Sequence, residues 1–252
     1  SLYHPSLSRR HILSVRQFTR DDLHALFAVA QEMRFLVQRH GTLDILRGRL
    51  LSTLFYEEST RTSSSFEAAM LRCGGQVVSI NTSRSSVAKG ETLADTVRTL
   101  GCYSDVIVLR HPAVGSSQEA AKFSPVPIIN AGDGSHQHPT QALLDAVTMR
   151  QRLGLRGDNG FEGLKVKIVG DCLHSRVVRS NVDLLNTLGA EVTLVGPATL
   201  MPFGVENWPV RVSYDFDAEI AEADVVMMLR VQAERMQGGF FPSHREYATL
   251  LG

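Results

Sequence analysis

Apolar residues recur every three or four positions between Asp21 and His40, and Gly41 follows directly. This spacing places the apolar side chains on one face of a helix, and glycine commonly ends such a helix. Similar stretches predict further helices at residues 62–73, 91–102, 140–153 and 176–188.

Shorter apolar runs separate these helical stretches. They predict strands at residues 50–56, 77–80, 106–109, 126–130, 166–170, 191–195, 210–214 and 225–229. Where strands and helices alternate along a chain, the usual arrangement is a series of βαβ units whose strands pair in parallel. The pattern therefore predicts an α/β protein built on parallel sheets.

The chain contains one strong interior break. The predicted helix at 140–153 ends in the glycine-rich segment 154–160, after which the alternation of strands and helices starts again. We therefore predict two doubly wound parallel-sheet domains joined by this helix, residues 1–145 and residues 146–252.

Composition excludes several classes of protein. Lys plus Arg and Asp plus Glu both number 26, so the chain lacks the global basic field that draws proteins to nucleic acid or to acidic membranes. No apolar run is long enough for a membrane helix. Cys73, Cys102 and Cys172 are far apart and show no metal-binding spacing, which predicts reduced thiols and a cytoplasmic location.

The segment Ser59–Thr62, with the sequence Ser-Thr-Arg-Thr, lies where a predicted strand ends and a helix begins. The N–H groups and partial positive charge of a helix N-terminus receive anions, and hydroxyl and guanidinium groups add donors. The segment therefore predicts a phosphate cradle. A simple helix cap is the alternative, and Ser64-Ser65-Phe66-Glu67 could itself start the helix.

Arginines follow several of the predicted strands, namely Arg61, Arg110, Arg176 and Arg230. Ligands of open α/β sheets bind beyond the carboxyl ends of the strands. An unpaired guanidinium at a buried strand end is costly. Arginines repeated at such positions therefore favour a polyanionic ligand over solvated surface charges.

His136 and His138 have a spacing that also occurs in metal sites. No third ligand is spaced to match, and Asp133 nearby belongs to a predicted glycine-rich turn. A neutral imidazole that donates to a carbonyl oxygen is the better use of one of these histidines. We predict no metal and no cofactor. The polar segment 79–90 predicts a long, functional loop.

Several motifs, taken in order along nearly the whole chain, resemble the aspartate carbamoyltransferases of the aspartate/ornithine carbamoyltransferase family. The motifs are residues 55–62, Lys89-Gly90-Glu91-Thr92-Leu93-Ala94-Asp95-Thr96, Arg110-His111-Pro112, Asn130-Ala131-Gly132-Asp133-Gly134, residues 138–145 and Arg230-Val231-Gln232. The resemblance implies transfer of the carbamoyl group of carbamoyl phosphate to L-aspartate, in pyrimidine biosynthesis, with the active site in the cleft between the two domains.

The resemblance also implies the site residues. Phosphate would be bound by Ser59, Thr60, Arg61, Thr62 and Arg110. Arg61, Thr62 and His138 would face the carbamoyl oxygen, and Gln141 the carbamoyl nitrogen. The carboxylates of aspartate would be bound by Arg176, Arg230 and Gln232. Ser85 and Lys89 would reach a neighbouring subunit's site, with Lys89 contacting both substrates, so the active unit would be a homotrimer with shared active sites. The catalytic group would be Arg61, Thr62, His138 and Lys89.

Two alternatives to this function remain. One is a transcarbamoylase for another amine such as ornithine, and the other is a non-catalytic assembly domain of the same fold. The resemblance implies that relatives continue past Gly252 with a loop and a helix, so the aspartate-binding domain is expected to lack its C-terminal part. Regulatory chains and other pyrimidine-pathway domains remain possible partners.

Overall fold

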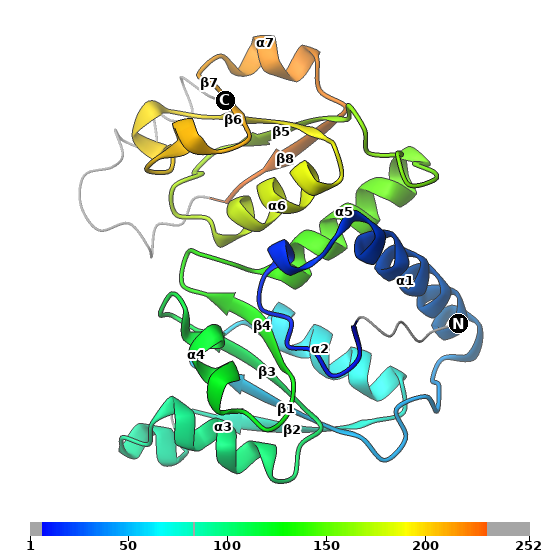
Figure 1. Cartoon of the computed structure of the whole chain (residues 1–252), viewed down its shortest axis with the longest axis vertical. Helices are drawn as coiled ribbons and strands as arrows, with labels where there is room; N and C mark the ends of the chain where they lie inside the picture. The colour runs from blue at the N-terminus through cyan, green and yellow to red at the C-terminus, as the bar shows by residue number, and fades with distance from the viewer. Residues whose placement is uncertain (1–6, 83, 231–252) are drawn as a thin grey trace. The chain divides into compact units, whose positions relative to one another are not determined.

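The computed structural model describes residues 7–82 and 84–230 (Figure 1). The chain divides into two compact units, Ser1–Gln141 and Ala142–Gly252, called unit 1 and unit 2 below. The division falls near the start of helix α5 (Pro139–Leu153), a few residues before the boundary predicted at 145. None of the helices in the described ranges combines the length and the apolar composition that a membrane span needs.

Unit 1 is built on a four-stranded parallel sheet in the order β2-β1-β3-β4. The strands are β1 (Leu50–Phe55), β2 (Gln76–Asn81), β3 (Val106–His111) and β4 (Ile128–Asp133). The helices are α1 (Arg20–His40), α2 (Thr60–Arg72), α3 (Leu93–Gly101) and α4 (Ser116–Phe123), with the 3-10 helices η2 (Val15–Gln17) and η3 (Ser86–Lys89).

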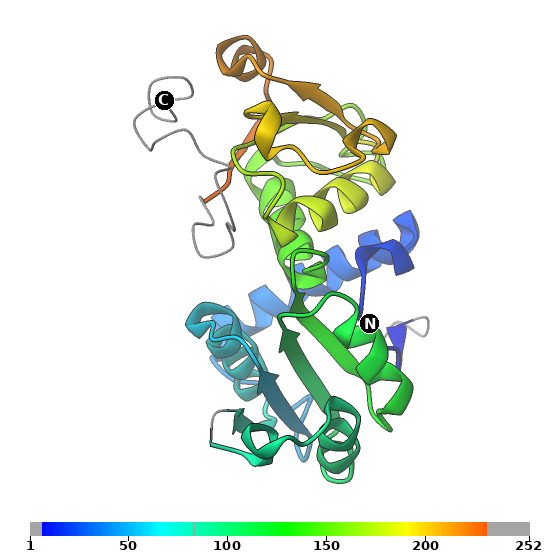
Figure 2. The same cartoon turned by 90° about the vertical axis from the view of Figure 1, so that its left-hand side faces the viewer.

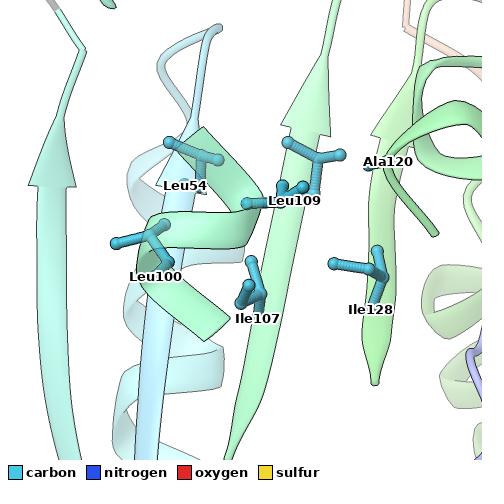
Figure 3. Packing of buried hydrophobic residues seen from close by; sticks show 7 residues of the cluster. Leu54, Leu100, Ile107, Leu109, Ala120 and Ile128 are labelled. Atoms are coloured by element: carbon cyan, nitrogen blue, oxygen red, sulfur yellow. The ribbon is translucent and has the colours of Figure 1, made fainter. Parts of the chain in front are cut away.

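Helices cover both faces of this sheet, as the burial of successive strand residues requires. Ile107 and Leu109 on β3 pack with α3 and α4 in one apolar cluster (Figure 3). Val108, the residue between them, packs on the opposite face with Met70 of α2. The strands of unit 1 therefore run between α2 on one side and α3 with α4 on the other (Figures 1 and 2).

Unit 2 repeats the plan with a four-stranded parallel sheet in the order β7-β6-β5-β8. Its elements are β5 (Lys165–Val169), α6 (Arg176–Thr187), β6 (Glu191–Val195), η4 (Ala198–Leu200), η5 (Val205–Asn207), β7 (Arg211–Ser213), α7 (Phe216–Ala221) and β8 (Val225–Met228). Helix α6 buries Val178, Val182, Leu184 and Leu185. This burial explains why apolar residues recur every three or four positions along this part of the sequence.

Three features differ from the sequence-based expectation. Helices α4 and α7 were not predicted, because α4 buries Ser116, Ser117 and Ala120 instead of large apolar residues, and α7 has only six residues. Helix α2 begins at Thr60, two residues before the predicted start at 62 and four before the alternative start at Ser64. Strand β4 runs through Asp133, which is therefore a strand residue and does not belong to the expected turn.

Candidate active site

The start of α2 forms the centre of the site in unit 1. Ser59 is the N-cap residue, but its side chain makes no capping hydrogen bond. The first helical bond runs from Ser63 N to Ser59 O at 2.9 Å, so the N–H groups of residues 60–62 precede the helical ladder. This geometry favours the anion cradle over the side-chain cap, because the hydroxyl is not used for capping.

Arg110 lies beside this cradle. It is paired with Phe55 across the neighbouring strands β3 and β1, which brings it to the carboxyl end of β1. Its Nη1 donates to Thr62 Oγ1 at 3.1 Å, and its Nε lies 3.6 Å from Glu57 Oε2. The Arg110 side chain is only 11% exposed, so the Glu57 carboxylate offsets part of the cost of burying this charge.

His111 directly follows Arg110 and is the last residue of β3. Its ring centroid lies 4.6 Å from that of Tyr56, and its Nδ1 accepts a hydrogen bond from Ala113 N at 3.0 Å. Burial lowers the pKa of His111, against the opposing effect of Glu57 and Glu119, so the neutral ring is favoured. Burial also raises the pKa of Tyr56.

His138 and Gln141 follow β4, the neighbour of β3. His138 is buried and directly precedes α5, while Gln141 is half-buried in the first turn of that helix. His136 lies near Asp133, with Nδ1 3.7 Å from Oδ2. Within residues 7–82 and 84–230, no group of three or more His, Cys, Asp or Glu residues is arranged to hold a metal ion.

Two arginines follow neighbouring strands of unit 2, β5 and β8. Arg176 is the first residue of α6, which follows β5, and it is 3% exposed. Leu229 N donates to Val169 O at 2.9 Å, which places Arg230 beside the segment that follows β5. Arg230 itself is exposed. The two guanidinium groups therefore belong to one edge of the sheet, as a ligand with two carboxylates requires.

The turn between β5 and Arg176 is closed by a buried carboxylate. Asp171 Oδ1 accepts from His174 N at 3.1 Å, and Oδ2 lies 2.9 Å from His174 Nδ1. Asp171 is 1% exposed. Burial and the nearby Asp171 charge raise the pKa of Cys172 to about 12, so this thiol is not a nucleophile at neutral pH.

The remaining predicted site residues lie elsewhere. Ser85 and Lys89 belong to the connection between β2 and α3, where Lys89 ends η3 and is exposed. Ser85 Oγ donates to Thr82 O at 3.3 Å within this connection. Gln232 lies outside the described residues.

Sequence reasoning missed some polar residues around the site. Glu57 precedes the cradle by two residues, but only the pairing of β1 with β3 shows that it meets Arg110. Asp133 and Asp171 each occur next to a glycine, a pattern typical of exposed turns. Both are buried in the structure, and no signal in a single sequence indicates this.

The fold and these residues define a class of protein. Unit 1 is a parallel α/β unit with a phosphate-type cradle at the carboxyl ends of its strands, and unit 2 carries paired arginines at the equivalent edge. The family model described as aspartate/ornithine carbamoyltransferase, carbamoyl-P binding domain, matches residues 10–151. The chain belongs to the aspartate/ornithine carbamoyltransferase family.

Individual relatives agree with this assignment. The aspartate carbamoyltransferase catalytic subunit of Corynebacterium glutamicum is 60% identical over 251 residues, covering 96% of this chain and 79% of that protein. The catalytic subunit of Mycolicibacterium smegmatis is 54% identical over 255 residues, covering 98% and 79%.

Solved structures give the same result. Aspartate transcarbamoylase from Trypanosoma cruzi in complex with carbamoyl aspartate and phosphate has a TM-score of 0.85 at 38% identity, covering 92% of this chain and 75% of that chain. Its ligand-free form has a TM-score of 0.81 at 37% identity, covering 92% and 78%. The predicted family and the predicted α/β class with two parallel sheets are confirmed.

Proposed function

We propose that this chain transfers the carbamoyl group of carbamoyl phosphate to the amino group of L-aspartate, which gives N-carbamoyl-L-aspartate and phosphate in pyrimidine biosynthesis. The observation that carries the proposal is the cradle at the start of α2, with Arg110 held beside it by Thr62 and Glu57. The 60% identity to an aspartate carbamoyltransferase catalytic subunit supports the same activity.

The residues of unit 1 suit the carbamoyl phosphate side of the reaction. Ser59, Thr60 and Arg110 would bind the phosphate oxygens, and Arg61 would reach both the phosphate and the carbonyl oxygen. As the amine attacks, negative charge develops on the carbonyl oxygen and then on the leaving phosphate. Donors fixed at these positions stabilise the transition state. Thr62 and His138 would contribute such donors, and Gln141 would orient the carbamoyl nitrogen.

The residues of unit 2 suit a dicarboxylate acceptor. Arg176 and Arg230 follow the neighbouring strands β5 and β8 and can each pair with one carboxylate of aspartate, with Gln232 as a further ligand. Ornithine carries a single carboxylate and a side-chain ammonium, which a second arginine would repel. The paired arginines therefore favour aspartate over ornithine.

We further propose a cytoplasmic homotrimer in which neighbouring subunits share active sites. The exposed position of Lys89 at the end of η3 suits a residue that acts outside its own subunit, and Ser85 would accompany it. Regulatory chains and other pyrimidine-pathway domains remain candidate partners.

The test is to incubate the purified protein with carbamoyl phosphate and either L-aspartate or L-ornithine, and to measure carbamoylated product. We expect carbamoyl aspartate and no citrulline. Citrulline alone would identify an ornithine enzyme. A trimer that binds phosphate but forms neither product would favour the assembly domain.

A further inference from the structure

Asp133 is a fully buried carboxylate in unit 1 with no place in the proposed chemistry. It is the last residue of β4 and is 0% exposed. A buried charge is costly unless hydrogen bonds satisfy it, and here the charge lies beside a site that binds an anion. Its position therefore needs a physical reason.

The carboxylate joins two separate loops. Oδ1 accepts from Gln137 N at 2.9 Å, within the turn that leads to His138. Oδ2 accepts from Gly115 N at 3.0 Å, at the end of the loop that follows Arg110 and His111. Each oxygen therefore holds the backbone of one loop. One of these loops follows Arg110 and His111 at the end of β3, and the other leads into His138.

Further bonds strengthen the same junction. Asn130 Nδ2 donates to Asp133 Oδ1 at 3.3 Å, and His136 Nδ1 lies 3.7 Å from Oδ2. The backbone of Asp133 also pairs with Gln137, since Asp133 N donates to Gln137 O at 3.2 Å. Gly134 N donates to His111 O at 2.9 Å, which ties the turn to the end of β3.

We propose that Asp133 is a positioning residue that fixes the loop after Arg110 and the turn before His138 relative to each other. This inference rests on the proposed function, because it explains how two ligands from different strands are aimed at one carbamoyl phosphate. The carboxylate acts through these residues and its oxygens are occupied by protein donors. Small misplacements of such ligands reduce the rate strongly, which gives a buried carboxylate a function here.

The test is Asp133→Asn, which preserves the size of the side chain. An amide offers one oxygen and one NH₂ group, so whichever way it turns, the N–H of Gly115 or of Gln137 faces another donor. The two loops are thereby uncoupled. We expect the KM for carbamoyl phosphate to rise and kcat to fall by about tenfold each, tenfold being about 1.4 kcal/mol. At saturating carbamoyl phosphate the KM for aspartate should stay within about twofold, since unit 2 is unchanged.

Ser104→Ala is the matched control. Ser104 Oγ lies 2.5 Å from Ser52 Oγ in the buried core of unit 1, next to the start of β3 and away from both loops. This variant also loses a buried hydrogen bond, so it reproduces a loss of stability. We expect its KM for carbamoyl phosphate and its kcat to match the unsubstituted protein.

A second measurement needs no variant. Inorganic phosphate should slow hydrogen exchange at the Gly115 and Gln137 amides together, because both are held by one carboxylate. Protection of neither amide, or of only one, contradicts the proposal. So do unchanged kinetic constants in a folded Asp133→Asn protein. If the unsubstituted protein forms no carbamoyl aspartate, the proposed function fails. The phosphate experiment still tests Asp133 in that case.

Discussion

Arg61 is the second residue of α2, with an exposed side chain at the helix terminus. From this position the Arg61 guanidinium can donate hydrogen bonds to the carbonyl oxygen and to the leaving phosphate, the two places where negative charge develops. We therefore expect Arg61 to stabilise the transition state of the reaction more than the folded state of the protein.

We predict that Arg61→Ala lowers kcat/KM by about 10²–10³, the usual loss for one oxyanion donor. The free energy of unfolding should change by less than about 0.5 kcal/mol, because the side chain is exposed. Steady-state kinetics and thermal unfolding check both values. Arg98→Ala, an exposed arginine in the last turn of α3, is the control and should retain activity. Near-normal turnover of Arg61→Ala would exclude the proposed role.

The protonation of His111 is expected to make both the stability of the protein and its activity depend on pH. Burial lowers its pKa, so the folded protein favours the neutral ring. The resulting stabilisation is complete above the unfolded pKa of about 6.5 and is lost as pH falls through the lowered folded value. Protonation of His111 Nδ1 would also turn this acceptor into a donor, so it could no longer accept the hydrogen bond from Ala113 N. The loss of this bond would disturb the loop that follows Arg110.

His111→Asn should remove this pH effect. An asparagine oxygen can accept from the N–H two residues on and does not titrate. We expect the variant to lose less of its kcat/KM for carbamoyl phosphate than the unsubstituted protein between about pH 7 and pH 5. Titration of the substrate is common to both proteins and cancels in the ratio. Parallel pH profiles would contradict the prediction.

At the scale of elements, a buried ion pair fastens α7 to the sheet of unit 2. Lys167 on β5 is 3% exposed, and its Nζ lies 2.7 Å from Glu219 Oε2 and 3.2 Å from Thr193 Oγ1. The hydrogen bond from Lys167 is the main cause that lowers the pKa of Glu219. This stabilisation is therefore present above the ordinary glutamate pKa of 4.5 and is lost as pH falls through the lowered pKa of Glu219.

We predict that Glu219→Gln destabilises unit 2 by about 3 kcal/mol, because it leaves the Lys167 ammonium buried without its counter-charge. The double variant Lys167→Met/Glu219→Gln should recover much of this loss. Chemical denaturation at pH 7 measures both. Equal stabilities of the single variant and the unsubstituted protein would show that the pair contributes little.

Elements differ in how far the sequence predicts them. Strands β1, β3, β5 and β6 follow from short runs rich in apolar residues, because strands covered on both faces bury most of their residues. Helix α4 does not follow, since its buried face consists of small residues. The end of β4 does not follow either, because Asn130 and Asp133 resemble turn residues until their buried hydrogen bonds are known.

At the scale of the whole molecule, the proposed sharing of active sites between subunits predicts complementation between inactive variants. Arg61→Ala and Lys89→Ala damage opposite sides of a shared site. In trimers reassembled from an equal mixture, about one quarter of the sites should contain neither substitution. Activity should therefore return on mixing. Mixed Arg61→Ala and Thr62→Ala proteins, both altered on the same side, provide the control and should stay inactive. No recovery in either mixture would contradict shared sites.

The sequence by itself determined the α/β class, the cradle at 59–62 and the arginines at strand ends, because apolar periodicity and residue chemistry are local properties. Tertiary structure alone decided that Arg110 meets Thr62 and Glu57, that Arg176 and Arg230 follow strands that are neighbours in the sheet, and that Asp133 is buried between two loops. These facts depend on strand order and register. Both follow from packing between segments far apart in the chain, which no local pattern specifies.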